Sequence, residues 1–185
     1  MAVGDHRCPG WRGSGWRDRP GATVSYRRIL AIDPGKEAGW CLFCDGFCHS
    51  SGGADGESVA EVRRIYEHTV PEIVVIEDQH FNPRVSPYAI KTLVERAALW
   101  YWLAIDRGID VAERVPALAW QDWAGIPRQK RKPKTSDKTA RKQLINLRAS
   151  EVAGTTTMDN ESDAVLLCSY WFNAVLPVVE ENEST

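Results

Sequence analysis

With 185 residues, 43% of them apolar and 26% charged, the chain has the size and composition of one soluble domain with a substantial core. Its apolar stretches are too short for a transmembrane helix, and its first 25 residues lack the apolar segment of a secretory signal. We therefore expect a cytoplasmic protein with reduced thiols, with no membrane partner. The net charge of −2 hides one strongly basic segment, in which Asp137 is the only acid among Arg128, Lys130, Arg131, Lys132, Lys134, Lys138, Arg141 and Lys142.

Composition divides the chain into three parts. Residues 1–26 are rich in Arg, Gly and Pro and predict a flexible basic extension. An alternative is a basic arm that contacts DNA and stacks Trp11 and Trp16 on bases. Residues 27–175 carry the periodic patterns of a folded domain, and residues 176–185 form an acidic tail. A basic segment beside a neutral body is typical of a protein with one anionic partner on one face.

The first hairpin is the clearest structural signal. Residues 29–32 form an apolar run typical of a strand buried on both faces, and the run ends on Asp33. Pro34-Gly35 predicts a turn, and residues 38–44 resume strand composition. Asp45-Gly46 is a strong hairpin signal, which predicts a third strand over residues 47–53.

The middle of the chain repeats the pattern of a strand that ends on an acid. Residues 57–69 have apolar side chains at helical spacing, and Pro71 ends that helix. Residues 72–76 form a second buried strand that ends on Glu77. A loop over 78–87 then leads into a long helix over 88–106.

The last third predicts a strand and three helices. Residues 109–115 alternate like a strand, and Pro116 begins a short helix in which we expect Trp120 to be a packing residue. A basic loop follows, then a helix over 137–148 capped by Ser136 and a final helix from Asp159 or Asn160 to Trp171. The whole pattern predicts an α/β fold with a mixed five-stranded sheet flanked by helices, in the order β-β-β-α-β-α-β-α.

Three acids predict a metal site. Asp33 and Glu77 end neighbouring strands, and Asp163 begins the apolar part of the last helix. Asn160 lies one helical turn before Asp163, and Asp159 is an alternative fourth ligand unless it caps the helix. An all-oxygen cluster suits Mg²⁺ or Mn²⁺, and two such ions about 4 Å apart promote phosphodiester hydrolysis.

The ordered motifs IDPG with its DG hairpin, VVIEDQ and NESDA resemble those of the RuvC family of Holliday junction resolvases, especially the phage-type members. The resemblance spans residues 27–172. It implies a ribonuclease H-like fold and a homodimer, formed in part by helix 88–106. It also implies Mg²⁺-dependent, symmetric cleavage of four-way DNA junctions, with two ions per active site and Mn²⁺ as a substitute.

The resemblance also implies roles for individual residues. Asp33, Glu77 and Asp163 match the family's metal-binding acids, whereas Asn160 departs from the Asp or His of the family at the fourth position. Lys138 matches a basic residue near the scissile phosphate, although an ordinary solvated lysine is an alternative. Stacking on junction bases is implied for Phe81, which could instead pack in its loop. The expected DNA-binding residues are Phe81, Arg84, Arg128, Lys130, Arg131, Lys132, Lys134, Lys138 and Arg141.

Several alternatives remain open at this stage. Trp100, Tyr101 and Trp102 could form a dimer interface or ordinary core. The spacing of Cys41, Cys44, Cys48 and His49 suggests zinc, but Cys41 and Cys44 should lie on opposite faces of a strand, which favours packing. The function could also be that of a non-catalytic junction-binding protein, or of a related nuclease acting on other branched or hybrid nucleic acids. A sugar or acetate kinase relative would need a second lobe that the chain lacks.

Overall fold

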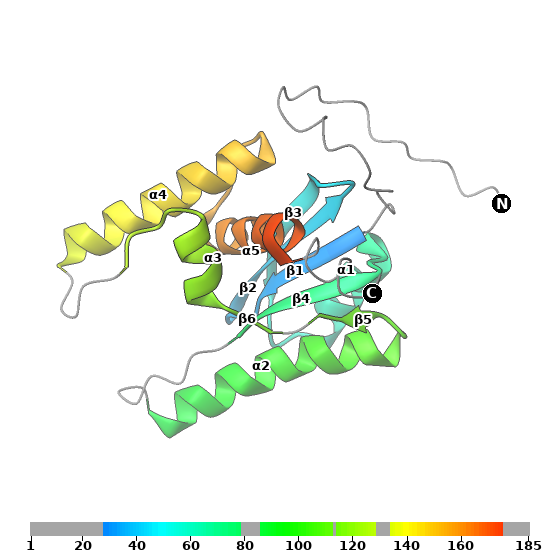
Figure 1. The fold of residues 1–185 in the computed structure, drawn as a ribbon. Helices are drawn as coiled ribbons and strands as arrows, with labels where there is room; N and C mark the ends of the chain where they lie inside the picture. The colour runs from blue at the N-terminus through cyan, green and yellow to red at the C-terminus, as the bar shows by residue number, and fades with distance from the viewer. Residues whose placement is uncertain (1–27, 79–85, 113, 129–133, 176–185) are drawn as a thin grey trace, which may run out of the picture.

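The computed structural model describes residues 28–78, 86–112, 114–128 and 134–175. In the described part of the chain, one mixed sheet has helices on both faces (Figure 1). The strands are β1 (Arg28–Asp33), β2 (Glu37–Cys44), β3 (Phe47–Asp55), β4 (Ile73–Asp78), β5 (Asp110–Val111) and β6 (Val115–Pro116). The helices are α1 (Val59–Thr69), α2 (Pro87–Asp106), α3 (Ala117–Trp123), α4 (Thr135–Ala153) and α5 (Asp159–Tyr170), followed by a π-helical turn, η1 (Trp171–Val175). The predicted extension over 1–26 and the acidic tail over 176–185 lie outside the described residues.

The sheet confirms the predicted mixed α/β class. Its order is β3-β2-β1-β4-β5, and the short β6 pairs with the far end of β4. The first three strands are antiparallel, and Asp45 and Gly46 take the positive φ angles that a tight two-residue hairpin requires. β1 and β4 run parallel, as do β4 and β5.

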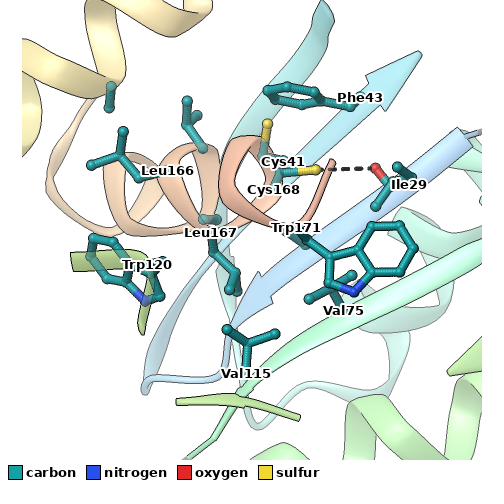
Figure 2. Close-up of a cluster of buried hydrophobic side chains, with 14 of the residues drawn as sticks. Ile29, Cys41, Phe43, Val75, Val115, Trp120, Leu166, Leu167, Cys168 and Trp171 are labelled. Atoms are coloured by element: carbon teal, nitrogen blue, oxygen red, sulfur yellow. Dashed lines mark hydrogen bonds between the residues drawn. The ribbon is translucent and has the colours of Figure 1, made fainter. Parts of the chain in front are cut away.

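Alternation along the strands divides the core between the two faces. Ile29 and Ala31 face the cluster beneath α5, α4 and α3, whereas Leu30 and Ile32 face the cluster covered by α1 and α2. Figure 2 shows the first of these clusters, in which Leu166 and Leu167 of α5 lie over the sheet. None of the helices within the described ranges is long and apolar enough to cross a membrane.

The cysteines occupy the opposite faces that strand alternation predicts. Cys41 is buried beneath α5, with its Sγ 3.5 Å from that of Cys48. Cys44 packs instead against the α1/α2 cluster. Cys168 of α5 completes the buried sulfur group and donates to the Ile29 carbonyl, at 3.6 Å (Figure 2). These thiols therefore belong to the packing of the domain, as predicted.

The boundaries of two predicted elements differ from the structure. The strand expected over 109–115 is two short strands, β5 and β6, each paired with a different part of β4. The helix expected over 137–148 runs from Thr135 to Ala153. Asp137, rather than Ser136, accepts a hydrogen bond from the Lys134 backbone N–H (3.3 Å), and Gly154 ends the helix with a positive φ.

Gly39 lets α5 approach the sheet closely. A Cβ built on Gly39 would lie 1.7 Å from the backbone carbonyl oxygen of Asn160, at the first turn of α5. No side-chain rotation relieves a clash with backbone, so α5 would have to move. The contact therefore fixes the position of the helix that carries Asp163.

We expect Gly39→Ala to lower the free energy of unfolding by roughly 3 kcal/mol, because α5 cannot keep its place over β2. Chemical denaturation measures this. Gly53→Ala is the matched control, since Gly53 is the cross-strand partner of Gly39 and the nearest atom to its added Cβ is 3.9 Å away. Equal losses from the two variants would contradict the close-approach argument.

Candidate metal centre

The two strand-end acids lie side by side, as predicted. β1 and β4 are in parallel register up to the pair Ile32 and Ile76, and Asp33 and Glu77 follow immediately. Since alternate residues share a face, both carboxylates lie on the face covered by α5. Their side chains are hydrogen-bonded to each other.

Burial dominates the electrostatics of this pair. Desolvation raises the pKa of Asp33 above its usual range, and the hydrogen bond with Glu77 partly opposes that rise. The pKa of Glu77 is raised further, by desolvation and then by the negative charge of Asp33. Two adjacent carboxylates of this kind favour a shared proton or a bound cation.

α5 brings the third acid to the same place. Burial, followed by the charge of Asp33, raises the pKa of Asp163 to about 7. The Oδ1 atom of Asp163 is buried and has no hydrogen-bond partner among the described residues. A buried carboxylate oxygen without a partner is costly in a folded protein, and a cation would compensate it.

The basic helix α4 forms the other wall of the centre. A cleft of about 280 Å³ is lined by Asp163 and Asp159 on one side and by Lys138, Arg141, Lys142 and Ile145 on the other. The charges of Arg141 and Lys142 partly offset the rise in the pKa of Asp163. The sequence had not singled out Lys142 as a site residue, although it lies one helical turn after Lys138 and therefore on the same face.

Both candidates for a fourth ligand have other partners. The Asn160 side-chain amide donates to Glu37 Oε2 at 3.2 Å. Asp159 pairs with Lys142 Nζ at 2.7 Å and accepts from Asn146 at 2.9 Å, and these contacts lower its pKa. Asp159 is the first helical residue, with Met158 at the N-cap position, so it is not the cap.

The donor set suits a hard divalent cation. Three carboxylates converge on one end of the sheet, one oxygen atom lacks a partner, and oxygen donors are those that Mg²⁺ and Mn²⁺ prefer. Within the described ranges, however, no three His, Cys, Asp or Glu side chains are grouped closely enough to enclose an ion as they stand. The residues therefore fit the cation in chemistry, with Asp33 and Glu77 in contact and Asp163 within electrostatic reach of both.

Trp120 makes a contact that sequence reasoning missed. It is buried, as predicted for a packing residue, but its indole Nε1 also donates to Glu77 Oε1 at 2.8 Å. The two residues are 43 positions apart and share no motif, so only the pairing of β6 with β4 reveals their proximity.

The expected DNA-binding residues divide into two groups. Lys138 and Arg141 line the cleft, Lys134 is exposed at the start of α4, and Arg128 is paired with Asp122. The others, Phe81, Arg84, Lys130, Arg131 and Lys132, lie outside the described residues.

Comparison with known proteins shows that the fold of this chain is similar to those of solved structures. No family model matches the sequence, and no curated protein matches it. Thermus thermophilus RuvC in complex with a Holliday junction substrate superposes with a TM-score of 0.58 at 14% identity, covering 80% of this chain and 96% of that one. Another T. thermophilus RuvC structure gives 0.54 at 16% identity, covering 81% and 96%. The yeast mitochondrial Holliday junction resolvase Ydc2 gives 0.45 at 16% identity, covering 79% and 78%.

The sheet order, the helices on both faces and the two RuvC superpositions show a ribonuclease H-like α/β fold. Within that class, the fold of the chain is similar to that of RuvC, which confirms the fold that the sequence resemblance implied.

Proposed function

We propose that the protein is a metal-dependent endonuclease that resolves four-way DNA junctions by symmetric phosphodiester hydrolysis. The observation that carries this proposal is the cleft itself. It places Asp163, next to the Asp33–Glu77 pair, opposite three basic side chains of α4. A centre with acids on one wall and cations on the other suits a metal ion and a phosphate group together.

The residues then have distinct roles. Asp33, Glu77 and Asp163 bind Mg²⁺, and Asn160 remains the candidate for a further oxygen ligand. When bound by these residues, the metal would supply Lewis-acid chemistry at the phosphate and would activate water. Lys138, with Arg141 and Lys142, contacts the phosphate and balances the charge that develops on it.

Further contacts come from the basic segment. Lys134 and Arg128, together with Phe81, Arg84, Lys130, Arg131 and Lys132, would bind the DNA arms beyond the cleft. Contacts of lysine and arginine with phosphate give salt-sensitive affinity without sequence preference.

Two copies of the chain, joined through α2, would cut both strands. Trp100 is fully buried and belongs to the core, but Trp102 and Tyr88 on the same helix are 64% and 78% exposed. A hollow of about 430 Å³ beside Trp102 is lined mainly by apolar residues of α2. A second copy covering this apolar face would supply the second active site that symmetric cleavage requires.

The test is cleavage of a mobile four-way junction by the purified protein in Mg²⁺ or Mn²⁺. Paired nicks at symmetric positions support the proposal, and cutting of only flaps or RNA–DNA hybrids indicates a different nuclease. A non-catalytic junction-binding protein is the second candidate, because Asn160 and Asp159 have other partners. Tight binding without cutting in either metal would favour it.

Lys138 and Lys134 should differ in their kinetic effects. We expect Lys138→Ala to lower the single-turnover cleavage rate roughly 30-fold while changing junction affinity little, because it removes a cation beside the reacting phosphate. Lys134→Ala, at the exposed start of the same helix, should weaken binding slightly and leave the rate at saturation unchanged. Similar losses of rate from both variants would contradict a special role for Lys138.

A further inference from the structure

Trp120 occupies a defined place beside the acid pair. β6 pairs with β4 at the register Glu77 to Val115, and α3 begins immediately after β6. β6 therefore lies beside the strand end that carries Glu77, and Trp120 follows β6 by only a few residues. The side chain is 1% exposed and packs in the cluster beneath α5 together with Leu166 and Leu167 (Figure 2).

The contact between the two side chains is directional. Trp120 Nε1 lies 2.8 Å from Glu77 Oε1, and an indole N–H can only donate. It therefore fixes the orientation of one carboxylate oxygen while adding no positive charge that would compete with a metal ion. A lysine or arginine at this position would instead neutralise the carboxylate.

The helix that carries Trp120 is itself anchored. Arg141 of α4 donates from its guanidinium to Gln121 Oε1 at 2.7 Å and to the Pro127 carbonyl oxygen at 3.3 Å. The Gln121 carbonyl also accepts from the Ile126 backbone N–H at 2.8 Å. The two Arg141 bonds connect α3 and the segment after it to the basic helix α4. Trp120 is therefore held both by the packing of its ring and by the anchoring of its helix.

We infer that Trp120 is a positioning residue, which holds the Glu77 carboxylate in the orientation that binds the metal. The inference rests on the proposed function only in that Glu77 is taken as a metal ligand. Partners of metal-binding side chains commonly change metal affinity by 10- to 100-fold. The indole ring of Trp120 fills space in the core, and its N–H orients the carboxylate of Glu77.

The test compares the removal of the N–H with the removal of ring volume. Replacing Trp120 by benzothienylalanine keeps the bicyclic shape but removes the donor, and Trp120→Phe removes both the donor and part of the ring. Trp171→Phe is the control, since Trp171 is buried in the same cluster. Mn²⁺ binding is measured by calorimetry on the full chain, with thermal unfolding alongside.

We expect the affinity for Mn²⁺ to be about tenfold weaker in both position-120 variants. The affinity of Trp171→Phe should be unchanged. In a Glu77→Gln background, benzothienylalanine at position 120 should cause no additional loss. The Mg²⁺ concentration for half-maximal junction cleavage should rise by the same factor, with the rate at saturating metal largely recovered.

Unchanged Mn²⁺ affinity with benzothienylalanine, or an equal loss from Trp171→Phe, would show that Trp120 only packs. Absence of Mn²⁺ binding by the wild-type chain would overturn the inference together with the metal centre. If the wild-type chain binds Mn²⁺ but does not cut junctions, the proposed function is wrong, and the calorimetric comparison still decides the role of Trp120.

Discussion

Asp33→Asn should lower the rate of junction cleavage by roughly a thousandfold or more while leaving junction binding nearly intact. Asp33 contacts Glu77 and lies within electrostatic reach of Asp163, so its charge acts on both of the other acids. The amide keeps the shape of the side chain but removes the charge that holds a divalent cation. The DNA contacts proposed for α4 would not depend on that charge.

Single-turnover cleavage and an electrophoretic binding assay, both on the same junction, measure the two quantities. Asp110→Asn is the matched control, because Asp110 is an exposed acid on β5, at the opposite end of the β4 pairing. A residual cleavage rate within tenfold of the wild type would contradict a catalytic role for Asp33. Loss of binding in parallel with cleavage would instead show that the substitution disturbs the DNA surface.

The second large effect concerns the stability of the metal-free protein. We expect Asp163→Asn to raise the free energy of unfolding at pH 8 in EDTA by roughly 2 kcal/mol, because an amide carries no charge to desolvate. The ionised carboxylate of the wild type is, by contrast, partly buried beside two other acids. A substitution at the active site should therefore stabilise the fold, although it should abolish cleavage.

The burial of Asp163 also determines how the stability of the metal-free protein depends on pH. The pKa of Asp163 rises from an ordinary value of 3.8 to about 7 on folding, so the folded state binds its proton more tightly. The resulting stabilisation is fully present below pH 3.8 and is lost as the pH rises through about 7. Between pH 5 and 8 the wild type without metal should thus lose stability, and Asp163→Asn should lose less.

Urea unfolding at pH 5 and pH 8 measures both effects. Asp159→Asn is the control, since the pKa of Asp159 is lowered by Lys142 and Asn146, and its loss should not stabilise the protein. Mg²⁺ should stabilise the wild type more at pH 8 than at pH 5, because at low pH it must displace protons. An Asp163→Asn protein that is less stable than the wild type at pH 8 would contradict the argument.

The sequence was most informative where local chemistry decides the structure. The apolar runs before Asp33 and Glu77 predicted buried strands, and parallel pairing then had to bring the two acids to one edge of the sheet. Asp163 could be predicted because an acid followed by a strongly apolar helical run lies on or beside the buried face of that helix.

Tertiary contacts decided what the sequence could not predict. The fourth ligand depends on which way Asn160 turns, and that is set by Glu37, which is 123 residues away in sequence. The start of α4 was misplaced by two residues because Asp137 caps from inside the helix, where Ser136 had seemed the better candidate. The bond from Trp120 to Glu77 depends on a strand of only two residues, which is too short to have a sequence pattern.

The close fit of α5 against Gly39 has a consequence for the order in which the molecule is made. α5 supplies Asp163 and also covers one face of the sheet, so a ribosome-bound chain that ends before residue 159 has neither. Such a chain would expose Ile29, Ala31 and Val75, and it would hold two acids without the third. Completion of the core and the gathering of the three acids are therefore one event, and a nascent chain brings Asp163 to the other two acids only when it also loses its exposed apolar face.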